Sequence, residues 1–221
     1  MPAKDKSKRV LIVDDHPMMR QGLAQLIDNE PDLKVAAEAD NARQAMSTLA
    51  AQKVDLVLLD ISLPDKNGLE VIKDIQALNP GLPILAVSMH DEALYAERVL
   101  RAGGRGYIMK QEGGKKLLDA IRQVLSGQIF VSEKISARIL ELFSGRRSAS
   151  TSPVERLTDR EFEVFQLIGE GHSTRDIAGR LKLSVKTVEV HRANIKLKLK
   201  LKNATDLVRH AVRWIEAEGK R

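Results

Sequence analysis

The chain has 221 residues and a net charge of +6, with 43% apolar and 30% charged residues. This composition is typical of soluble globular proteins, and the length suits one large or two small domains. Cysteine is absent, which excludes disulfides, thiol catalysis and cysteine-ligated metal sites. The N-terminal segment is polar, and no run approaches the about 18 apolar residues of a membrane helix. We therefore expect a cytoplasmic protein with no signal peptide and no membrane contact.

The basic residues are unevenly distributed along the chain. Residues 1–130 hold 17 Lys+Arg and 18 Asp+Glu, a net charge of −1, whereas residues 151–221 hold 15 and 10, a net charge of +5. This asymmetry favours a near-neutral module joined to one that binds a polyanion. A solvated lysine-rich surface would give the same count, so charge alone leaves both interpretations open.

The first 127 residues alternate short apolar runs with amphipathic stretches. Strand-like runs cover residues 10–13, 34–37, 55–59, 83–87 and 106–109, and helical spacing covers residues 18–27, 42–51, 69–78, 94–100 and 117–125. Parallel neighbours need crossover connections, which helices supply. Strict alternation therefore predicts an α/β domain over residues 8–127 with a doubly wound, five-stranded parallel sheet.

The pattern changes after this domain. We interpret residues 128–153 as a linker with a possible helix at 132–143, because the segment ends in the small, polar and basic run SGRRSASTSP. Residues 154–217 contain four helical stretches, which predicts a small all-α domain. Helix starts are marked by Thr158 with Glu161, Ser173 with Asp176, Ser184, and either Asn203 or Thr205.

Two features of these helices leave alternatives open. Residues 195–202 read IKLKLKLK, an alternation that by itself indicates a strand, but the context favours a third helix that continues to about Leu199. The fourth helix, which carries Trp214 beside its apolar stripe, is a candidate dimer face, but packing of this stripe into the core explains the pattern at least as well. The stripe is formed by Leu207, Val208, Ala211, Val212 and Ile215.

Acidic and polar residues follow four of the predicted strands. Asp14 and Asp15 end the first strand, Asp60 the third, Ser88 the fourth and Lys110 the fifth. In an open α/β sheet, ligands bind beyond the carboxyl ends of the strands. If the sheet order is 2-1-3-4-5, three carboxylates converge there, which implies a divalent cation, and donors that are all oxygen favour Mg²⁺.

Each of these residues also has a structural explanation. A single aspartate at a strand end is most often a helix cap or a turn residue. The coincidence at four strand ends favours a site, in which Lys110 could pair with a phosphoryl oxygen. His16 and His90 flank the cleft on loops, and we expect neither of them to be a ligand.

Residues 9–125 resemble the receiver domain of bacterial two-component response regulators. The motifs that carry the resemblance are RVLIVDDHP, DLVLLDISLPDKNG and GYIMK, although Gln111 follows the lysine where many receivers have proline. The resemblance implies that Asp60 accepts a phosphoryl group from a sensor histidine kinase. It also implies the roles of the other residues: Mg²⁺ ligands Asp14, Asp15, Asp60 and the backbone carbonyl of Ser62, switch residues Ser88 and Tyr107, and the family's lysine, Lys110.

A helix-turn-helix is predicted at about residues 173–192, with Lys182 and Leu183 in the turn. On its second helix Val188, His191 and Ile195 share one face and should pack inward. Small and apolar residues on the opposite, charged face suit thymine methyl groups, and basic residues suit phosphates. The candidate DNA-binding residues are Lys186, Thr187, Glu189, Val190, Arg192, Ala193, Lys196 and Lys200; Glu189 either accepts from a cytosine amino group or is simply solvated.

Residues 155–215 resemble the output domain of NarL/FixJ (LuxR-type) regulators. The motifs are LTDREFEVFQLIGEGHSTRDIAGRL, LSVKTVEVHRANIKLKL and NATDLVRHAV. Together the two resemblances imply a phosphorylation-controlled transcriptional regulator that is not an enzyme. The implied partners are a sensor histidine kinase, double-stranded promoter DNA and a second copy of the chain when phosphorylated or DNA-bound, with RNA polymerase as a further candidate.

Two other function classes remain as alternatives. A phosphatase with an aspartyl-phosphate intermediate would fit the acids, but haloacid dehalogenase-like enzymes carry a DxD pattern on the first strand, whereas Asp14 and Asp15 are adjacent. A pure interaction module would use its basic helices to contact a protein. DNA binding by residues 151–221 would discriminate both from a transcription factor.

Overall fold

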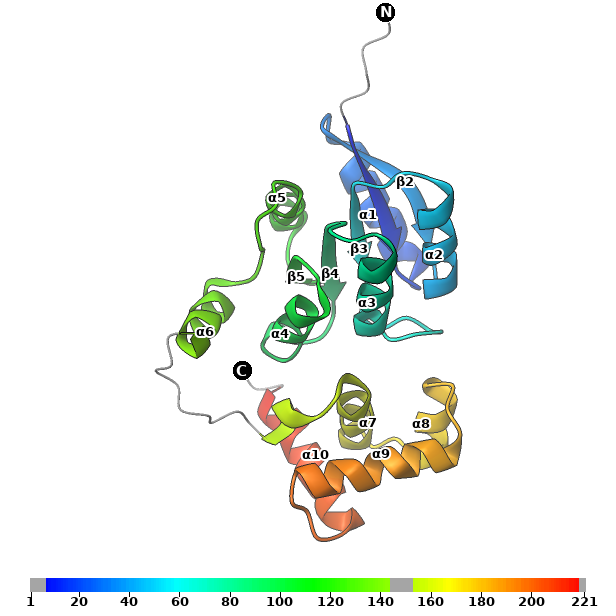
Figure 1. The fold of residues 1–221 in the computed structure, drawn as a ribbon, viewed down its shortest axis with the longest axis vertical. Coiled ribbons are helices and arrows are strands. Elements are labelled where there is room, and N and C mark those ends of the chain that lie inside the picture. Colours follow the sequence, from blue (N-terminus) through cyan, green and yellow to red (C-terminus); the bar gives the residue numbers. More distant parts are fainter. Residues whose placement is uncertain (1–6, 144–152, 219–221) are drawn as a thin grey trace, which may run out of the picture. The chain divides into compact units, whose positions relative to one another are not determined.

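The computed structural model describes residues 7–143 and 153–218 (Figure 1). The chain divides into two compact units, Met1–Phe143 and Ser144–Arg221. Within the described ranges, no helix combines the length and the apolar character needed to cross a membrane.

The first unit alternates strands and helices in the order that the sequence predicts. All strand pairs are parallel, and the sheet order is β2-β1-β3-β4-β5, which confirms the doubly wound topology. The strands are β1 (Lys8–Val13), β2 (Leu33–Ala39), β3 (Leu56–Leu59), β4 (Ile84–Ser88) and β5 (Gly106–Met109). The helices are α1 (Pro17–Asp28), α2 (Ala42–Ala51), α3 (Gly68–Leu78), α4 (Glu92–Ala102) and α5 (Gly114–Leu125).

The sheet is buried because helices cover both of its faces. Val10 and Ile12 of β1 lie in one core cluster with Ile27 of α1 and Ile121 of α5. Successive side chains of a strand point to opposite faces, so Leu11, which is also fully buried, faces the other side. Burial on both faces explains why β3 reads as a continuous apolar run.

Residues 128–143, which the sequence analysis assigns to the linker, belong to the first unit. Phe130 forms a parallel bridge with Gly106, and its carbonyl accepts a hydrogen bond of 2.9 Å from the backbone N–H of Tyr107. The predicted helix forms as α6 (Glu133–Phe143) and contacts α4. The backbone N–H of Ser132 donates to Oε1 of Glu92 at 2.7 Å. The linker sequence at 144–152 lies outside the described residues.

The second unit is helical, as predicted. A 3₁₀ turn (Pro153–Arg156) precedes α7 (Asp159–Gly169), α8 (Thr174–Arg180), α9 (Val185–Lys198) and α10 (Ala204–Glu218). The alternating segment IKLKLKLK is helical through Lys198, because Ile195 and Leu199 are buried one turn apart. Capping boxes form at Thr158 and Ser173, and the side chain of Asn203 accepts from the N–H of Asp206, so Asn203 caps α10.

The apolar stripe of α10 is narrower than the sequence predicts. Leu207 and Ala211 are fully buried, but Val208 is 41% exposed. The ring of Trp214 lies edge-on to Phe162 and Phe165, with centroid distances of 5.5 and 5.6 Å. Trp214 therefore packs on the core of the unit with a partly buried side chain.

Close backbone contact at the start of α3 makes a glycine necessary at position 68. A Cβ on Gly68 would lie 2.6 Å from Cα of Ile61 and 2.7 Å from the carbonyl oxygen of Asp60, whereas a Cβ on Gly22 of α1 would meet nothing within 4 Å.

We expect Gly68→Ala to lower the free energy of unfolding by about 1–3 kcal/mol through this overlap. Gly22→Ala should instead raise it by about 0.5–1 kcal/mol. Urea denaturation followed by far-UV circular dichroism measures both changes, and equal effects of the two substitutions would contradict the prediction.

Candidate functional site

A buried ion cluster lies at the carboxyl end of the sheet. Because β1 and β3 are neighbours, Asp14 and Asp60 come together, and Lys110, which follows β5, reaches both of them. Nζ of Lys110 is 2.7 Å from Oδ2 of Asp14 and 2.7 Å from Oδ2 of Asp60. All three side chains are at most 3% exposed. The structure thus brings together the acids and the lysine that the sequence places at separate strand ends.

The charges in this cluster depend on one another. Burial by itself lowers the pKa of Lys110, but its hydrogen bonds to Asp14 and Asp60 and the charges of these carboxylates outweigh burial and raise the pKa above its ordinary value. Lys110 is therefore a fixed cation at neutral pH. Removing one partner of such a buried cluster leaves the others uncompensated.

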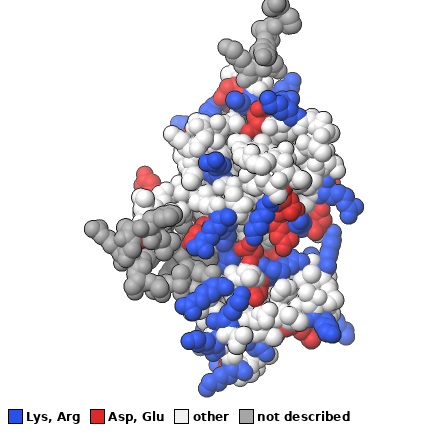
Figure 2. Space-filling model, in the orientation of Figure 1, with Lys and Arg blue, Asp and Glu red and all other residues white. Residues whose placement is uncertain are grey.

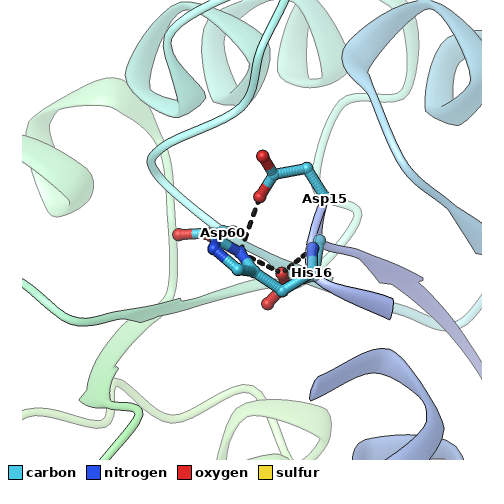
Figure 3. Close-up of side chains that lie close together, drawn as sticks. Asp15, His16 and Asp60 are labelled. Carbon is cyan, nitrogen blue, oxygen red and sulfur yellow. Dashed lines mark hydrogen bonds and ion pairs between the residues drawn. The ribbon is translucent and has the colours of Figure 1, made fainter. Parts of the chain in front are cut away.

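Asp15 and His16 complete the acidic cluster (Figure 3). Nδ1 of His16 lies 3.2 Å from Oδ1 of Asp14 and 2.8 Å from Oδ1 of Asp15. The contact with Asp15 is an ion pair only when His16 is protonated, and Oδ1 of Asp15 is buried without a hydrogen-bond partner in the described structure. The sequence analysis expects His16 to be no ligand; the structure places its nitrogen in the group.

The cluster fits a divalent cation. One ligand atom from each of Asp14, Asp15, His16 and Asp60 lies within 4.8 Å of the others. Carboxylate oxygens are the donors that Mg²⁺ prefers, and the buried oxygen of Asp15 is available to it. An acidic cluster of this kind is typical of a Mg²⁺ site in receiver domains.

A network of hydrogen bonds connects Asp60 to the loop after β4. The backbone N–H of Ser62 donates to Oδ1 of Asp60 at 3.1 Å, and Oγ of Ser62 is 2.9 Å from Nε2 of His90. The backbone N–H of His90 donates to Oγ of the fully buried Ser88 at 3.2 Å. The Tyr107 hydroxyl donates to the carbonyl of His90 at 2.7 Å.

Tyr107 points into the unit. Its side chain is 1% exposed, and burial raises the pKa of its hydroxyl above the ordinary value; the hydrogen bond with Ser88 lowers this pKa only in part, and the charge of Asp60 adds to the increase. Tyr107 is therefore neutral and acts as a hydrogen-bond donor.

The contacts of two residues around the site were not predicted from the sequence. Arg20 donates from Nη1 to the carbonyl of Asp14 at 2.6 Å and so holds the backbone of the acidic cluster. Its place in the first turns of α1, six residues after Asp14, is the signal that could have revealed it. His90 is expected on a loop beside the cleft, but its contact with Ser62 joins positions 28 residues apart and could not be foreseen from the sequence.

In the second unit, α8 and α9 form a helix-turn-helix. Oγ of Ser184 caps α9 by accepting from the N–H of Thr187 at 3.0 Å. Val188 and Ile195 are fully buried, as predicted for the inward face. His191 is partly buried, and burial together with Arg160 lowers its pKa while Glu161 opposes the shift, so it is an uncharged, structural histidine.

The opposite side of α9 exposes half of the candidate DNA-binding residues. Val190 is 52% exposed; Lys186, Glu189 and Ala193 are also exposed. Figure 2 shows Lys and Arg side chains on the face of this unit that α9 crosses in Figure 1. The remaining candidates are placed differently: Lys196 is half-buried, Thr187 and Arg192 lie partly buried at the edges of the face, and Lys200 is exposed beyond the helix end.

Comparisons with protein families agree with this division. The model of the response regulator receiver domain matches residues 10–122, and the model of the luxR family of bacterial regulatory proteins matches residues 155–211. The chain belongs to the two-component response regulators of the NarL/FixJ family, which carry a receiver domain and a LuxR-type helix-turn-helix. It is a transcription regulator rather than a catalytic enzyme.

Several relatives span almost the whole chain. The oxygen regulatory protein NreC of Staphylococcus epidermidis is 33% identical over 93% of this chain and 97% of its own, and the transcriptional regulatory protein UhpA of Escherichia coli is 36% identical over 90% and 95%. RcsB of Salmonella enterica, bound to promoter DNA in the presence of the phosphomimetic BeF₃⁻, is 25% identical over 93% and 98%, with a TM-score of 0.67. A further RcsB structure, 26% identical over 92% and 97% with a TM-score of 0.57, holds two dimers on two DNAs.

The C-terminal end of α9 is held by an ion pair between Lys198 and the buried carboxylate of Glu161. Glu161 is 4% exposed. Its carboxylate accepts hydrogen bonds from Nζ of Lys198 at 2.6 Å and from the backbone N–H of Thr158 at 2.8 Å. Burial raises the pKa of Glu161, but the bonds from Lys198 and Thr158 outweigh burial and lower it. The carboxylate therefore stabilises the fold fully above its unfolded pKa of about 4.3, and this contribution is lost as the pH falls through the lower folded pKa.

We expect Glu161→Gln to lower the free energy of unfolding of the second unit by about 1–3 kcal/mol at pH 7, with the difference from the wild type shrinking below about pH 4. Trp214 is the chain's single tryptophan, so its fluorescence during urea denaturation reports this unit. Glu189→Gln changes an exposed glutamate of α9 and should have no effect. A pH-independent loss in Glu161→Gln would contradict the assignment.

Proposed function

We propose that Asp60 is the residue that accepts a phosphoryl group from the phosphohistidine of a sensor histidine kinase. The observation that carries this proposal is the contact of Lys110 with Oδ2 of Asp60 in a buried acidic cluster. In the transfer, a carboxylate oxygen of Asp60 forms a bond to phosphorus while the bond from phosphorus to the kinase imidazole breaks. The positive charge of Lys110 stabilises the phosphoryl oxygens during this step.

The neighbours of Asp60 have defined parts in this proposal. Mg²⁺ held by Asp14, Asp15, Asp60 and the carbonyl of Ser62 would screen the charge of the incoming phosphoryl group. The hydroxyl of Ser88 turns toward a phosphoryl oxygen. Because Tyr107 already lies inward on the carbonyl of His90, phosphorylation would stabilise this arrangement and with it the surface beside α4.

We further propose that α9 enters the major groove of promoter DNA in a cytoplasmic dimer. Exposed Lys186 and Lys200 suit phosphates, and Val190 and Ala193 allow a close approach to thymine methyl groups. Thr187, Arg192 and Lys196 suit phosphates at the edge of the contact, and Glu189 suits a cytosine. Two-fold pairing places two copies of α9 about one helical turn apart, and the RcsB dimers on DNA support this arrangement. RNA polymerase is a further candidate partner.

Phosphorylation tests the first proposal. Incubation with acetyl phosphate and Mg²⁺ should label the wild type, and Asp60→Ala should remove the label because it removes the nucleophile. Asp119→Ala changes an exposed aspartate of α5 and serves as the matched control that keeps the label. The measurement is Phos-tag electrophoresis or intact mass, and undiminished labelling of Asp60→Ala would refute the assignment.

DNA binding tests the second proposal. The affinity of the full chain for duplex DNA should fall steeply with salt, because phosphate contacts release counterions. Lys186→Ala should reduce the slope of log K against log salt by about 1, whereas Lys115→Ala, an exposed lysine of α5, should leave it unchanged. Fluorescence anisotropy over a salt series measures the slopes. A wild-type affinity that does not respond to salt would instead favour a protein-interaction module.

A further inference from the structure

Lysine occupies two backbone positions of the second unit that normally favour glycine. In the described part of the chain, the non-glycine residues with a positive φ are Lys182 (51°) and Lys200 (55°). Every other described position with a positive φ is a glycine: Gly81, Gly103, Gly127 and Gly171. The left-handed region is costly for residues with a Cβ, and glycine is the usual residue just after a helix end. The two exceptions follow α8 and α9 and therefore bracket α9.

The turn between α8 and α9 requires this conformation at position 182. The backbone N–H of Lys182 donates to the carbonyl of Gly179 at 3.2 Å, and that of Leu183 donates to the carbonyl of Ala178 at 2.9 Å. Nη2 of Arg160 donates to the carbonyl of Leu181 at 2.7 Å. These bonds fix the turn from both sides, and any residue at position 182 must adopt the left-handed conformation.

The side chain of Lys182 is not needed by the folded unit. It is exposed, and within residues 7–143 and 153–218 it forms no ion pair and no side-chain hydrogen bond. Glycine would satisfy the turn at a lower conformational cost. The turn requires the left-handed backbone but not a lysine, and residues held in such a conformation cluster at functional sites.

Lys182 lies close to the N-terminus of α9, where its positive charge can contact an anion. It lies two residues before Ser184, which caps α9, and four residues before the exposed Lys186. The N-terminus of α9 adds the positive end of a helix dipole at the same place. The lysine and the helix dipole together form a positive region at the N-terminus of α9, the end of the helix that we expect to lie nearest the DNA.

We propose that Lys182 binds a phosphate of double-stranded DNA beside the groove that α9 enters, and that this contact is the reason for a lysine at a position where glycine would be more stable. The proposal rests on the DNA binding proposed above. Because the contact is to the DNA backbone, it adds affinity for any duplex rather than preference for one sequence.

The test uses a substitution with opposite effects on stability and on binding. In the full chain, Lys182→Gly should raise the melting temperature reported by Trp214 fluorescence by about 2–6 °C, since the strain is relieved. The same variant should bind a mixed-sequence duplex of about 30 base pairs more weakly. The loss of one phosphate contact corresponds to about tenfold weaker binding near 50 mM salt and about threefold near 200 mM, with the salt slope reduced by about 1.

Matched variants separate the charge from the backbone effect. Lys182→Gln keeps the strained backbone and loses the charge, so it should weaken binding equally without raising the melting temperature. Lys182→Arg keeps the charge and should bind as the wild type does. Lys34→Gln removes one charge from an exposed position of β2 and should leave binding unchanged, which controls for net charge.

The outcomes distinguish this proposal from the one it rests on. Wild-type binding that is steeply salt-dependent, together with unchanged binding by Lys182→Gly and Lys182→Gln, would overturn the role of Lys182 and leave DNA binding by α9 in place. Wild-type binding that does not depend on salt, with Lys186→Ala equal to the wild type, would overturn both. Weaker binding by Lys182→Gly and Lys182→Gln, with Lys34→Gln unchanged, supports the contact.

Discussion

The contact of one buried lysine with two buried carboxylates is the interaction on which the first unit depends for its function. Lys110, Asp14 and Asp60 come from three different strand ends, and each is almost inaccessible to water. A buried charge is tolerated only with its partners. The cluster therefore requires β1, β3 and β5 to keep their register, and it concentrates negative charge at the carboxyl end of the sheet, where we propose that a cation and a phosphoryl group bind. The same three charged side chains therefore affect both the stability of this unit and the chemistry of its site.

This arrangement connects the site to the rest of the unit through the loop after β4. Ser62 contacts both Asp60 and His90, and His90 in turn holds Ser88 and Tyr107. The backbone of Tyr107 pairs with Phe130, just before α6. Hydrogen bonds therefore connect Asp60 to Phe130, three residues before the start of α6. Contiguity alone does not measure coupling, but it defines which contacts a switch would have to rearrange.

Residues 195–202 and Trp214 show where pattern reasoning from the sequence succeeds and where it stops. The alternation IKLKLKLK has the period of a strand, yet the segment is helical through Lys198, because Ile195 and Leu199 are buried one turn apart on a helix that packs against α7. Trp214 has the same sequence context whether it faces a partner or the core. The edge-on contacts with Phe162 and Phe165 show that the ring packs on the core of its own unit. Tertiary contacts outweigh local propensity in both cases.

The sequence by itself determined the order of the elements, the five parallel strands, the helix caps and the strand-end acids, because periodicity, capping residues and strand ends are local properties. Only the tertiary structure decided which of these residues meet. The 2.7 Å contacts of Lys110, the entry of His16 into the acidic cluster and the attachment of residues 128–143 to the first unit join positions far apart in the chain or depend on how a loop closes. The left-handed backbone of Lys182 was equally invisible, since it is fixed by hydrogen bonds to α8 and by Arg160, and no residue pattern encodes them.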